Sequence, residues 1–355
     1  MNPSDAEALP YASLTPQQIG LQPPAGGLPD STRLGTVTLQ IADLDRSLAF
    51  YRDVIGMDLL VRRDTPGARA AQLGVPGEES VLLELREKPG ARFAPHRGRL
   101  GLYHLALLLP SRADLGGFLA HAQGLGVHVG QSDHFYSEAS YLTDPDGLSV
   151  EVYRDRPRAD WRVSPQGEIL GSGDPLDLKA LREAVGDVPW NGLPVGTILG
   201  HLHFYVGDLE QAERFYHAGL GFAKVGWSWP AALFVSAGGY HHHLGLNTWA
   251  VPSAPSGPDD ARLLTWELVL PDEGSVLGVA ERLRAQGFTV TPGERGLLAG
   301  DPWGIRVRIL SGEAEYLPLT PHRLGGVARP SLPDSIQVDG AGSDRPMGER
   351  ASPSV

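Results

Sequence analysis

Hydrophobic and polar residues alternate over short stretches of this chain, and each stretch is followed by a segment with helical spacing. The pattern is clearest in two places, LGTVTLQIADLDRSLAFYRDVIGM from Leu34 and LGHLHFYVGDLEQAERFYHAGLGF from Leu199. Alternation with a period of two predicts a strand with one buried face. The aspartate that follows, Asp43 or Asp208, predicts a helix N-cap, and a glycine marks the end of each helix.

Two weaker copies of the same pattern are GLYHLALLLPSRADLGGFLAHAQGLG and LLTWELVLPDEGSVLGVAERLRAQGF. After each helix, short apolar runs broken by glycine and proline indicate about three more strands. A unit that recurs along the chain determines the architecture before any single motif does. The sequence therefore predicts an α+β fold of four βαβββ modules.

A length of 355 residues suggests roughly two domains. We expect modules one and two to form a first domain and modules three and four a second, with a connector that holds one short helix in DLKALREAV. Both ends are rich in proline, glycine and serine without a periodic apolar face, which is typical of disordered tails. The expected boundaries are 1–30 (tail), 31–156 (first domain), 157–196 (connector), 197–312 (second domain) and 313–355 (tail).

Composition excludes several classes of function. The chain has no cysteine, so it has neither disulfides nor a thiolate nucleophile. Its formal net charge of −12 argues against a nucleic-acid partner, because phosphate binding needs clustered lysine and arginine. We find no apolar run of about 18 residues and no leader peptide, and we therefore expect no membrane span and a cytoplasmic protein.

Polar residues that interrupt the strands mark the candidate chemistry. His104 and His201 occupy the same place in modules two and three, where modules one and four have Thr36 and Thr265. The later strands of the four modules carry, in order, Glu84, Glu151, the run His241, His242 and His243, and Arg308.

Which modules share a site decides the set of ligands. Modules one and two would combine Thr36 and Glu84 with His104 and Glu151, and modules three and four would combine His201 and the histidine run with Thr265 and Arg308. Modules two and three would combine His104, Glu151 and His201 with His242 or His243. Two histidines and one carboxylate with open positions are typical of non-haem Fe(II) oxygenases.

Further side chains near these positions are secondary candidates. His203 shares the strand face of His201 and is a less favoured ligand. Neighbours in a strand point to opposite faces, so His242 and His243 are not both expected to face the site. Asn247 and Trp249 are candidates for the substrate pocket.

The chain resembles the vicinal oxygen chelate superfamily, which includes glyoxalases, bleomycin-resistance proteins and extradiol dioxygenases. The resemblance lies in the two strong copies of the repeat, in the segment DPDGLSVE at the end of module two, and in GGYHHHLGLNTW. The histidine run and the connector are similar to the two-domain catechol 2,3-dioxygenase branch. The resemblance covers about residues 33–311. Glyoxalases and drug-binding proteins use the same modules, so fold alone does not select the activity.

The resemblance implies Fe(II) as cofactor, with His201, His104 and Glu151 as ligands, although Mn(II) suits the same donors. It implies an acid or base at His242, with His243 as the rival, and a tyrosine ten positions before the carboxylate, which is Tyr141. It also implies a further active-site histidine, at His134. These ligands would come from modules two and three rather than from one two-module domain.

The function expected from this resemblance is cleavage of catechol or a substituted catechol by O₂ to a 2-hydroxymuconic semialdehyde, in aromatic catabolism or catechol detoxification. The partners would be a small aromatic diol and O₂, and the outer faces leave a homo-oligomer open. Two alternatives remain, a glyoxalase-type metal-dependent isomerase and a metal-free protein that binds aromatic compounds or drugs. Participation of Glu84 would favour the isomerase.

Overall fold

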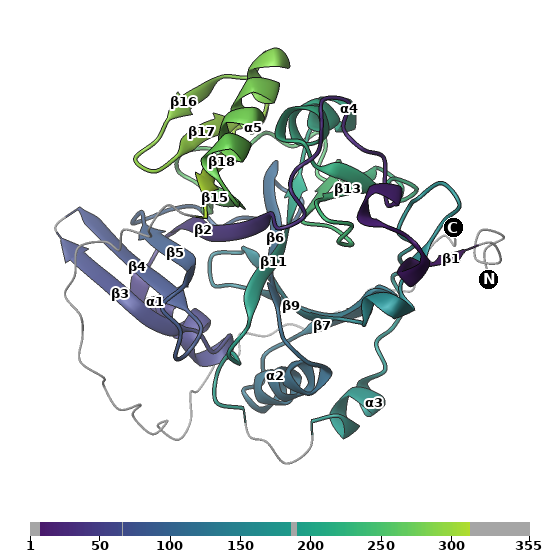
Figure 1. The fold of residues 1–355 in the computed structure, drawn as a ribbon. Coiled ribbons are helices and arrows are strands. Elements are labelled where there is room, and N and C mark those ends of the chain that lie inside the picture. The colour runs from purple at the N-terminus through teal and green to yellow at the C-terminus, as the bar shows by residue number, and fades with distance from the viewer. Residues whose placement is uncertain (1–7, 66, 186–189, 313–355) are drawn as a thin grey trace. The chain divides into compact units, whose positions relative to one another are not determined.

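The computed structural model describes residues 8–65, 67–185 and 190–312. Within these ranges each repeat folds as one strand, a helix and three further strands, which confirms the four βαβββ modules (Figure 1). Module one consists of β2 (Arg33–Ile41), α1 (Leu44–Ala49) with its π-helical continuation η4 (Phe50–Val54), β3 (Asp58–Thr65), β4 (Ala68–Gly74) and β5 (Val81–Glu87). Module two consists of β6 (Gly101–Leu108), α2 (Arg112–Gly124), β7 (Gly130–Asp133), β8 (Ser137–Thr143) and β9 (Ser149–Asp155).

The other two modules repeat this order. Module three consists of β11 (Ile198–Tyr205), α4 (Leu209–Ala212) with its π-helical continuation η6 (Glu213–Leu220), β12 (Ala223–Gly226), β13 (Ala232–Ser236) and β14 (Leu244–Asn247). Module four consists of β15 (Arg262–Leu270), α5 (Glu273–Ala285), β16 (Val290–Pro292), β17 (Leu297–Gly300) and β18 (Arg306–Ser311).

The helix boundaries follow the sequence signals. The Asp43 carboxylate accepts a hydrogen bond from the backbone N–H of Arg46, and the Asp208 carboxylate accepts one from Gln211, so both predicted N-caps are confirmed. Gly221 ends η6 with a φ of 98°, a left-handed conformation that glycine adopts without strain.

The modules pair across the sequence rather than along it. Among the described residues, modules two and three form one eight-stranded sheet in the order β12-β13-β14-β11-β6-β9-β8-β7. Modules one and four form the other, in the order β16-β17-β18-β15-β2-β5-β4-β3. In each sheet the first strands of two modules pair antiparallel, β11 with β6 and β15 with β2. The ranges 31–156 and 197–312 therefore each contribute one module to each sheet instead of forming a separate sheet.

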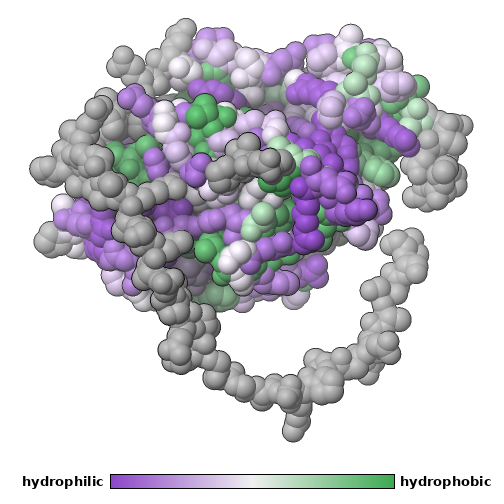
Figure 2. Space-filling view, turned by 90° about the horizontal axis from the view of Figure 1, so that it is seen from below, coloured by the Kyte–Doolittle hydropathy of each residue, from purple (hydrophilic) through white to green (hydrophobic). Residues whose placement is uncertain are grey.

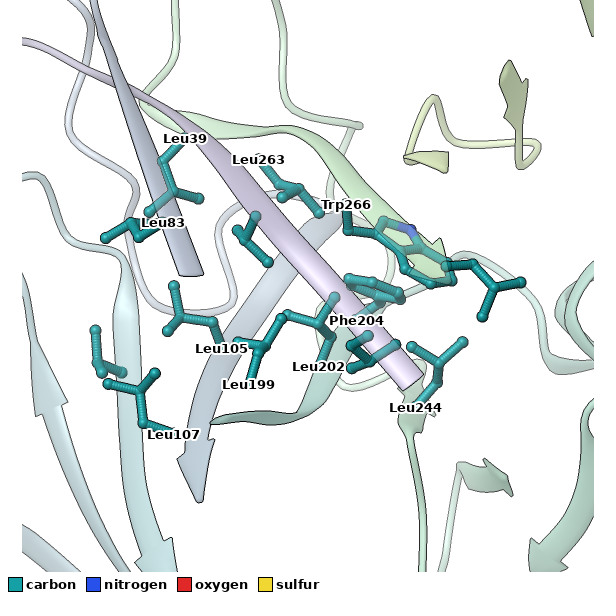
Figure 3. Packing of buried hydrophobic residues seen from close by; sticks show 14 of the residues in the cluster. Leu39, Leu83, Leu105, Leu107, Leu199, Leu202, Phe204, Leu244, Leu263 and Trp266 are labelled. Carbon is teal, nitrogen blue, oxygen red and sulfur yellow. The ribbon is translucent and has the colours of Figure 1, made fainter. Parts of the chain in front are cut away.

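One hydrophobic core lies between the sheets. Figure 3 shows Leu39 and Trp266 of the sheet of modules one and four beside Leu105, Leu202 and Phe204 of the sheet of modules two and three. All five are buried, with exposed fractions of 2% or less. Because burial of such side chains contributes about 1.5–3 kcal/mol each, this shared core stabilises the arrangement of all four modules.

The N-terminal segment corrects one expectation from the sequence. Residues 8–30 lie in the range expected to be a disordered tail, yet they hold β1 (Leu9–Pro10), η2 (Tyr11–Ser13) and η3 (Pro16–Gln18). Ile19 is fully buried, and the Tyr11 hydroxyl donates a hydrogen bond of 2.8 Å to the carbonyl of Gly239. Two isolated apolar anchors thus order a segment without periodicity. Residues 1–7 and 313–355, also expected to be disordered, lie outside the described residues.

The connector between modules two and three contains η5 (Arg158–Asp160), β10 (Arg162–Val163) and α3 (Leu178–Glu183), the last of which is the short helix expected there. β10 pairs with β1, and the connector and the N-terminal segment pack against Tyr136, Val225 and Tyr240 in a small second hydrophobic cluster. Hydrophobic patches are interspersed with hydrophilic side chains on the face in Figure 2. The described ranges contain no helix with the length and hydrophobicity to cross a membrane.

A tyrosine of one module binds an aspartate of the next. The Tyr51 hydroxyl donates to Oδ2 of Asp144 at 3.0 Å, and that of Tyr216 donates to Oδ2 of Asp301 at 3.0 Å. The other oxygen of Asp144 accepts from the backbone N–H groups of Asp146 and Leu148 and so closes the DPDG turn. Because all of these groups are buried, each pair ties a helix to the turn of a module in the other sheet.

Replacing Tyr51 by phenylalanine removes the donor and leaves a carboxylate oxygen of Asp144 buried without its side-chain partner. We expect the free energy of unfolding to fall by about 1–3 kcal/mol. Urea denaturation followed by circular dichroism measures this loss. Tyr216→Phe is the matched variant for the second pair, and an unchanged midpoint in both would contradict the role of the hydroxyls.

Burial raises the pKa of Asp144 to about 7, although backbone N–H groups bind its carboxylate. The folded chain therefore holds this proton at pH values where the unfolded carboxyl, with a pKa of about 3.9, has lost it. Because the unfolded state binds fewer protons in this window, stability falls as pH rises from about 4 to about 7.

Asp144→Asn stays uncharged, so the stability of the wild-type chain relative to this variant should decrease between pH 5 and pH 7.5. Urea denaturation of the two metal-free proteins at both pH values measures the difference. A difference that grows in favour of the wild type at the higher pH would refute this titration.

Candidate metal centre

Three strands of the sheet of modules two and three bring together two imidazoles and one carboxylate. His104 lies on β6, Glu151 on β9 and His201 on β11, and all three are at least 96% buried. Nε2 of His104 and Nε2 of His201 are 3.3 Å apart, and each lies 3.0 Å from Oε2 of Glu151. These are the three ligands that the sequence predicts, and they form the group in the described residues whose donor atoms could hold a metal ion.

The spacing of the three donor atoms fits a divalent cation. Ligands about 2.1 Å from one ion and at right angles to one another lie about 3.0 Å apart. The observed separations of 3.0 to 3.3 Å match that triangle. A set of two imidazoles and one carboxylate on one face of an ion leaves the opposite positions open for other ligands.

The electrostatics of the triangle favour metal binding. Burial by itself raises the pKa of Glu151, but the His201 and His104 imidazoles outweigh it and hold this pKa well below its usual range. Burial lowers the pKa of His201 to about 4, against the opposing charge of Glu151. The carboxylate is therefore ionised and His201 is neutral near pH 7, which are the forms that bind metal ions.

His203 lies beside the triangle, with its ring centroid 5.0 Å from that of His104. Its Nε2 is hydrogen-bonded to Asn247 and does not join the three donor atoms. Oδ1 of Asn247 accepts from the backbone N–H of Trp249 at 3.0 Å, which orients the amide so that its Nδ2 donates to Nε2 of His203 at 2.9 Å. Asn247 is fully buried and does not line the cavity, so it positions His203 instead of contacting a ligand.

The histidine run lies in the loop between β13 and β14. The ring centroid of His242 is 4.3 Å from that of His201, and its ring lines the cavity in front of the triangle. His243 points elsewhere, because its ring packs against Phe222 and its Nδ1 accepts from the backbone N–H of Ala237. The two rings thus face different sides, although they lie in a loop and not in a strand, where the sequence-based expectation of alternating faces would apply.

His242 is neutral in this environment. Burial is the main cause that lowers its pKa well below the usual value, and the nearby imidazoles of His201 and His241 act in the same direction. Nδ1 of His242 is hydrogen-bonded to Nδ1 of His241 at 2.8 Å, while Nε2 has no hydrogen-bond partner among the described residues.

His134 and Tyr141 form a pair at the same cavity. Nδ1 of His134 lies 2.7 Å from the carbonyl oxygen of Ser172, and its Nε2 lies 2.8 Å from the Tyr141 hydroxyl. A carbonyl only accepts, so Nδ1 of His134 carries a proton, and Nε2 can accept from the Tyr141 hydroxyl. Burial and then the charge of Glu151 raise the pKa of Tyr141 well above its usual value, so it remains a phenol.

The cavity in front of the triangle has a volume of about 110 Å³ and aromatic walls. Trp249 lines it, as expected, and none of the described lining residues is a lysine or an arginine. Four further aromatic residues line the cavity and were not predicted from the sequence: Tyr103, Tyr136, Trp229 and Phe234. Tyr103 and Tyr136 are adjacent or close in sequence to His104 and His134, but Trp229 and Phe234 carry no comparable signal.

Sequence similarity to known proteins supports this architecture. The sequence model of the Glyoxalase/Bleomycin resistance protein/Dioxygenase superfamily matches residues 33–152 and 198–309. The chain belongs to this superfamily. A catechol-2,3-dioxygenase of Bacillus subtilis is 42% identical over 275 residues, which are 77% of this chain and 95% of the relative. The resemblance found in the sequence and the expected enzyme of the dioxygenase type are thereby confirmed.

Two solved structures share the fold at low identity. A Bacillus subtilis protein provisionally named a dioxygenase aligns with a TM-score of 0.55 and 15% identity, over 81% of this chain and 86% of that one. Glyoxalase I from Zea mays aligns with a TM-score of 0.50 and 19% identity, over 79% of this chain and 92% of that one. Members with different activities thus share the superfamily fold, and the site has to select among them.

The other sheet of this superfamily member lacks the triangle. Glu84 lies at the place that corresponds to Glu151, but it pairs with Arg86 and Gln72. Glu84 and His104 lie in different sheets, so the pairing of modules one and two is wrong. The same holds for modules three and four, because His201 and Arg308 also lie in different sheets.

His104→Ala and His201→Ala should each abolish metal retention, because each removes one of three donors. Glu84→Ala is the matched control and should leave retention intact, since its carboxylate lies in the other sheet. The measurement is the metal content after anaerobic loading with Fe(II) and gel filtration. Loss of metal in Glu84→Ala with retention in the two histidine variants would overturn this assignment.

Proposed function

We propose that the protein is an Fe(II)-dependent extradiol dioxygenase that cleaves the ring of catechol or a substituted catechol. The observation that carries the proposal is the triangle of His104, His201 and Glu151 beside an aromatic cavity. The similarity to a catechol-2,3-dioxygenase supports the substrate class. The donor set suits Fe(II), and Mn(II) binds the same kinds of ligand.

Bound Fe(II) would supply adjacent open positions for the two catechol oxygens and O₂. The residues of the chain would bind the substrate ring and transfer protons. The aromatic walls of the cavity hold a flat ring, and the absence of lysine and arginine from its described lining favours a substrate without a carboxylate. Trp249 and Phe234 both border this space.

Proton transfer is assigned to His242 and to the pair of His134 and Tyr141. His242 is neutral, with an Nε2 that no described group occupies, so it can accept a proton from a catechol hydroxyl. The Tyr141 hydroxyl directs its proton to Nε2 of His134 and lies on the strand next to Glu151, so its oxygen can accept a hydrogen bond from a catechol hydroxyl.

The overall reaction balances without a further reductant. Catechol and one O₂ give one 2-hydroxymuconic semialdehyde, with both oxygen atoms incorporated and the carbon–carbon bond beside the diol broken. The glyoxalase-type alternative loses its motivating residue, because Glu84 lies away from the triangle. We include in the proposal a cytoplasmic role in aromatic catabolism or catechol detoxification.

The decisive test is oxygen uptake with catechol. Protein purified anaerobically and loaded with Fe(II) should consume one O₂ per catechol and form the yellow ring-opened product. A parallel sample loaded with Mn(II) assigns the metal. Metal binding without turnover would refute catechol as the substrate, and failure to bind either metal would favour the metal-free binding protein.

His242→Asn should lower kcat by about 10²–10⁴-fold, which is the usual contribution of a general base, while metal retention stays normal. His243→Asn is the matched control, because its ring lies outside the cavity and asparagine can still accept from the backbone of Ala237. Steady-state kinetics with catechol compare the variants. Equal losses in both would contradict the assignment of His242.

A further inference from the structure

A chain of hydrogen bonds leads from His242 to the end of strand β9. Nδ1 of His242 is 2.8 Å from Nδ1 of His241, and Nε2 of His241 is 2.8 Å from Oδ1 of Asp155. His241 is 98% buried, whereas the Asp155 side chain is 23% exposed. Asp155 lies four residues after Glu151 on β9, on the same strand face, so both carboxylates point toward the histidines.

Packing holds the middle of this chain in place. The ring of His241 stacks on Tyr136 with centroids 4.4 Å apart and planes 16° apart, and it contacts Tyr240 at 4.1 Å. Tyr240 in turn binds the Tyr153 hydroxyl at 2.7 Å. His241 therefore cannot turn away from Asp155 without disrupting several buried aromatic contacts.

The chemistry of each group determines where the protons lie. A carboxylate only accepts, so Nε2 of His241 must donate to Asp155. In a neutral ring the other nitrogen is then an acceptor, so Nδ1 of His241 accepts. The bond between the two Nδ1 atoms then requires His242 to donate from Nδ1. A neutral His242 that carries its proton on Nδ1 has an unprotonated Nε2.

We propose that Asp155 and His241 are positioning residues that fix the tautomer of His242, so that its Nε2 always faces the cavity as a proton acceptor. This inference rests on the proposed function only where it assigns a kinetic consequence. The tautomer itself is a property of the chain. The arrangement parallels the carboxylate that fixes the histidine tautomer in serine proteases, where the asparagine variant retains geometry but loses activity.

Asp155→Asn tests the inference because the side chain keeps its shape. The amide can donate to Nε2 of His241, which reverses both hydrogen bonds and leaves His242 with its proton on Nε2. We expect kcat with catechol to fall by about 10²-fold or more, with KM changed by less than about twofold. Asp160→Asn, which replaces an exposed carboxylate close by in the sequence, is the matched control and should retain full activity.

His241→Phe tests the middle of the chain while keeping an aromatic ring against Tyr136. Its loss in kcat should be similar to that of Asp155→Asn, and the double variant should lose no more than either single one. Additive losses would overturn the proposal, because they would mean that the two residues act independently. Metal retention, measured on every variant, separates this effect from damage to the triangle.

Nuclear magnetic resonance of metal-free protein labelled with ¹⁵N-histidine reads the tautomer directly. The His242 signals are assigned by their loss in His242→Asn. At pH 8, we expect a proton on Nδ1 of His242 in the wild type and on Nε2 in Asp155→Asn. A proton on Nε2 in the wild type would refute the inference. If catechol is not turned over, the proposed function fails, while this spectrum still tests the positioning role.

Discussion

The pairing of β6 with β11 is the contact on which the site depends, since it joins a module of the first half of the chain to a module of the second. In this pairing His201 lies opposite Ala106, and on the other side Ala106 lies opposite Glu151. Residues opposite one another across strands share a face. The fully buried alanine between them leaves room for the imidazole and the carboxylate to meet in front of the middle strand, where His104 joins them two residues away.

The same scaffold with other side chains does not make this site. In the sheet of modules one and four, Thr265 lies opposite Thr38, which lies opposite Glu84. There Glu84 forms an ion pair with Arg86, and Oε1 of Glu267 lies 3.3 Å from Nη1 of Arg308. Arginines therefore neutralise the charge of these buried carboxylates. A buried carboxylate needs a partner in either sheet. Modules two and three offer two imidazoles instead, which is why the triangle forms in this sheet and not in the other.

Much of this could be predicted from the sequence, because the relevant signals are local or repeated. Strand alternation and the aspartate caps predict the modules, and comparison of equivalent positions selects His104, His201 and Glu151. The crossed arrangement of the sheets could not be read from the repeat, since every module has the same unpaired first strand. For the site, the pairing of modules two and three could be inferred only from the chemistry of the candidate ligands. The ordered structure of residues 8–30 was not predicted, because Tyr11 and Ile19 are single buried side chains without periodicity.

The two histidine rings of the triangle are oriented by packing, whereas the rings around them are oriented by hydrogen bonds. Nδ1 of His104 and Nδ1 of His201 have no hydrogen-bond partner among the described residues, although the second nitrogen of a ligating histidine usually has one. Instead, each ring packs against a tyrosine. The ring centroids of His201 and Tyr153 are 4.7 Å apart, and those of His104 and Tyr103 are 4.6 Å apart.

His134, His203 and His241, in contrast, each have a carbonyl, an amide or a carboxylate that determines where the proton lies. Fixed tautomers around a packed triangle mean that the proton acceptors and donors at the cavity are in place before a ligand arrives. Such preorganisation is what catalysis requires of a site, because no side chain then has to be reoriented during the reaction.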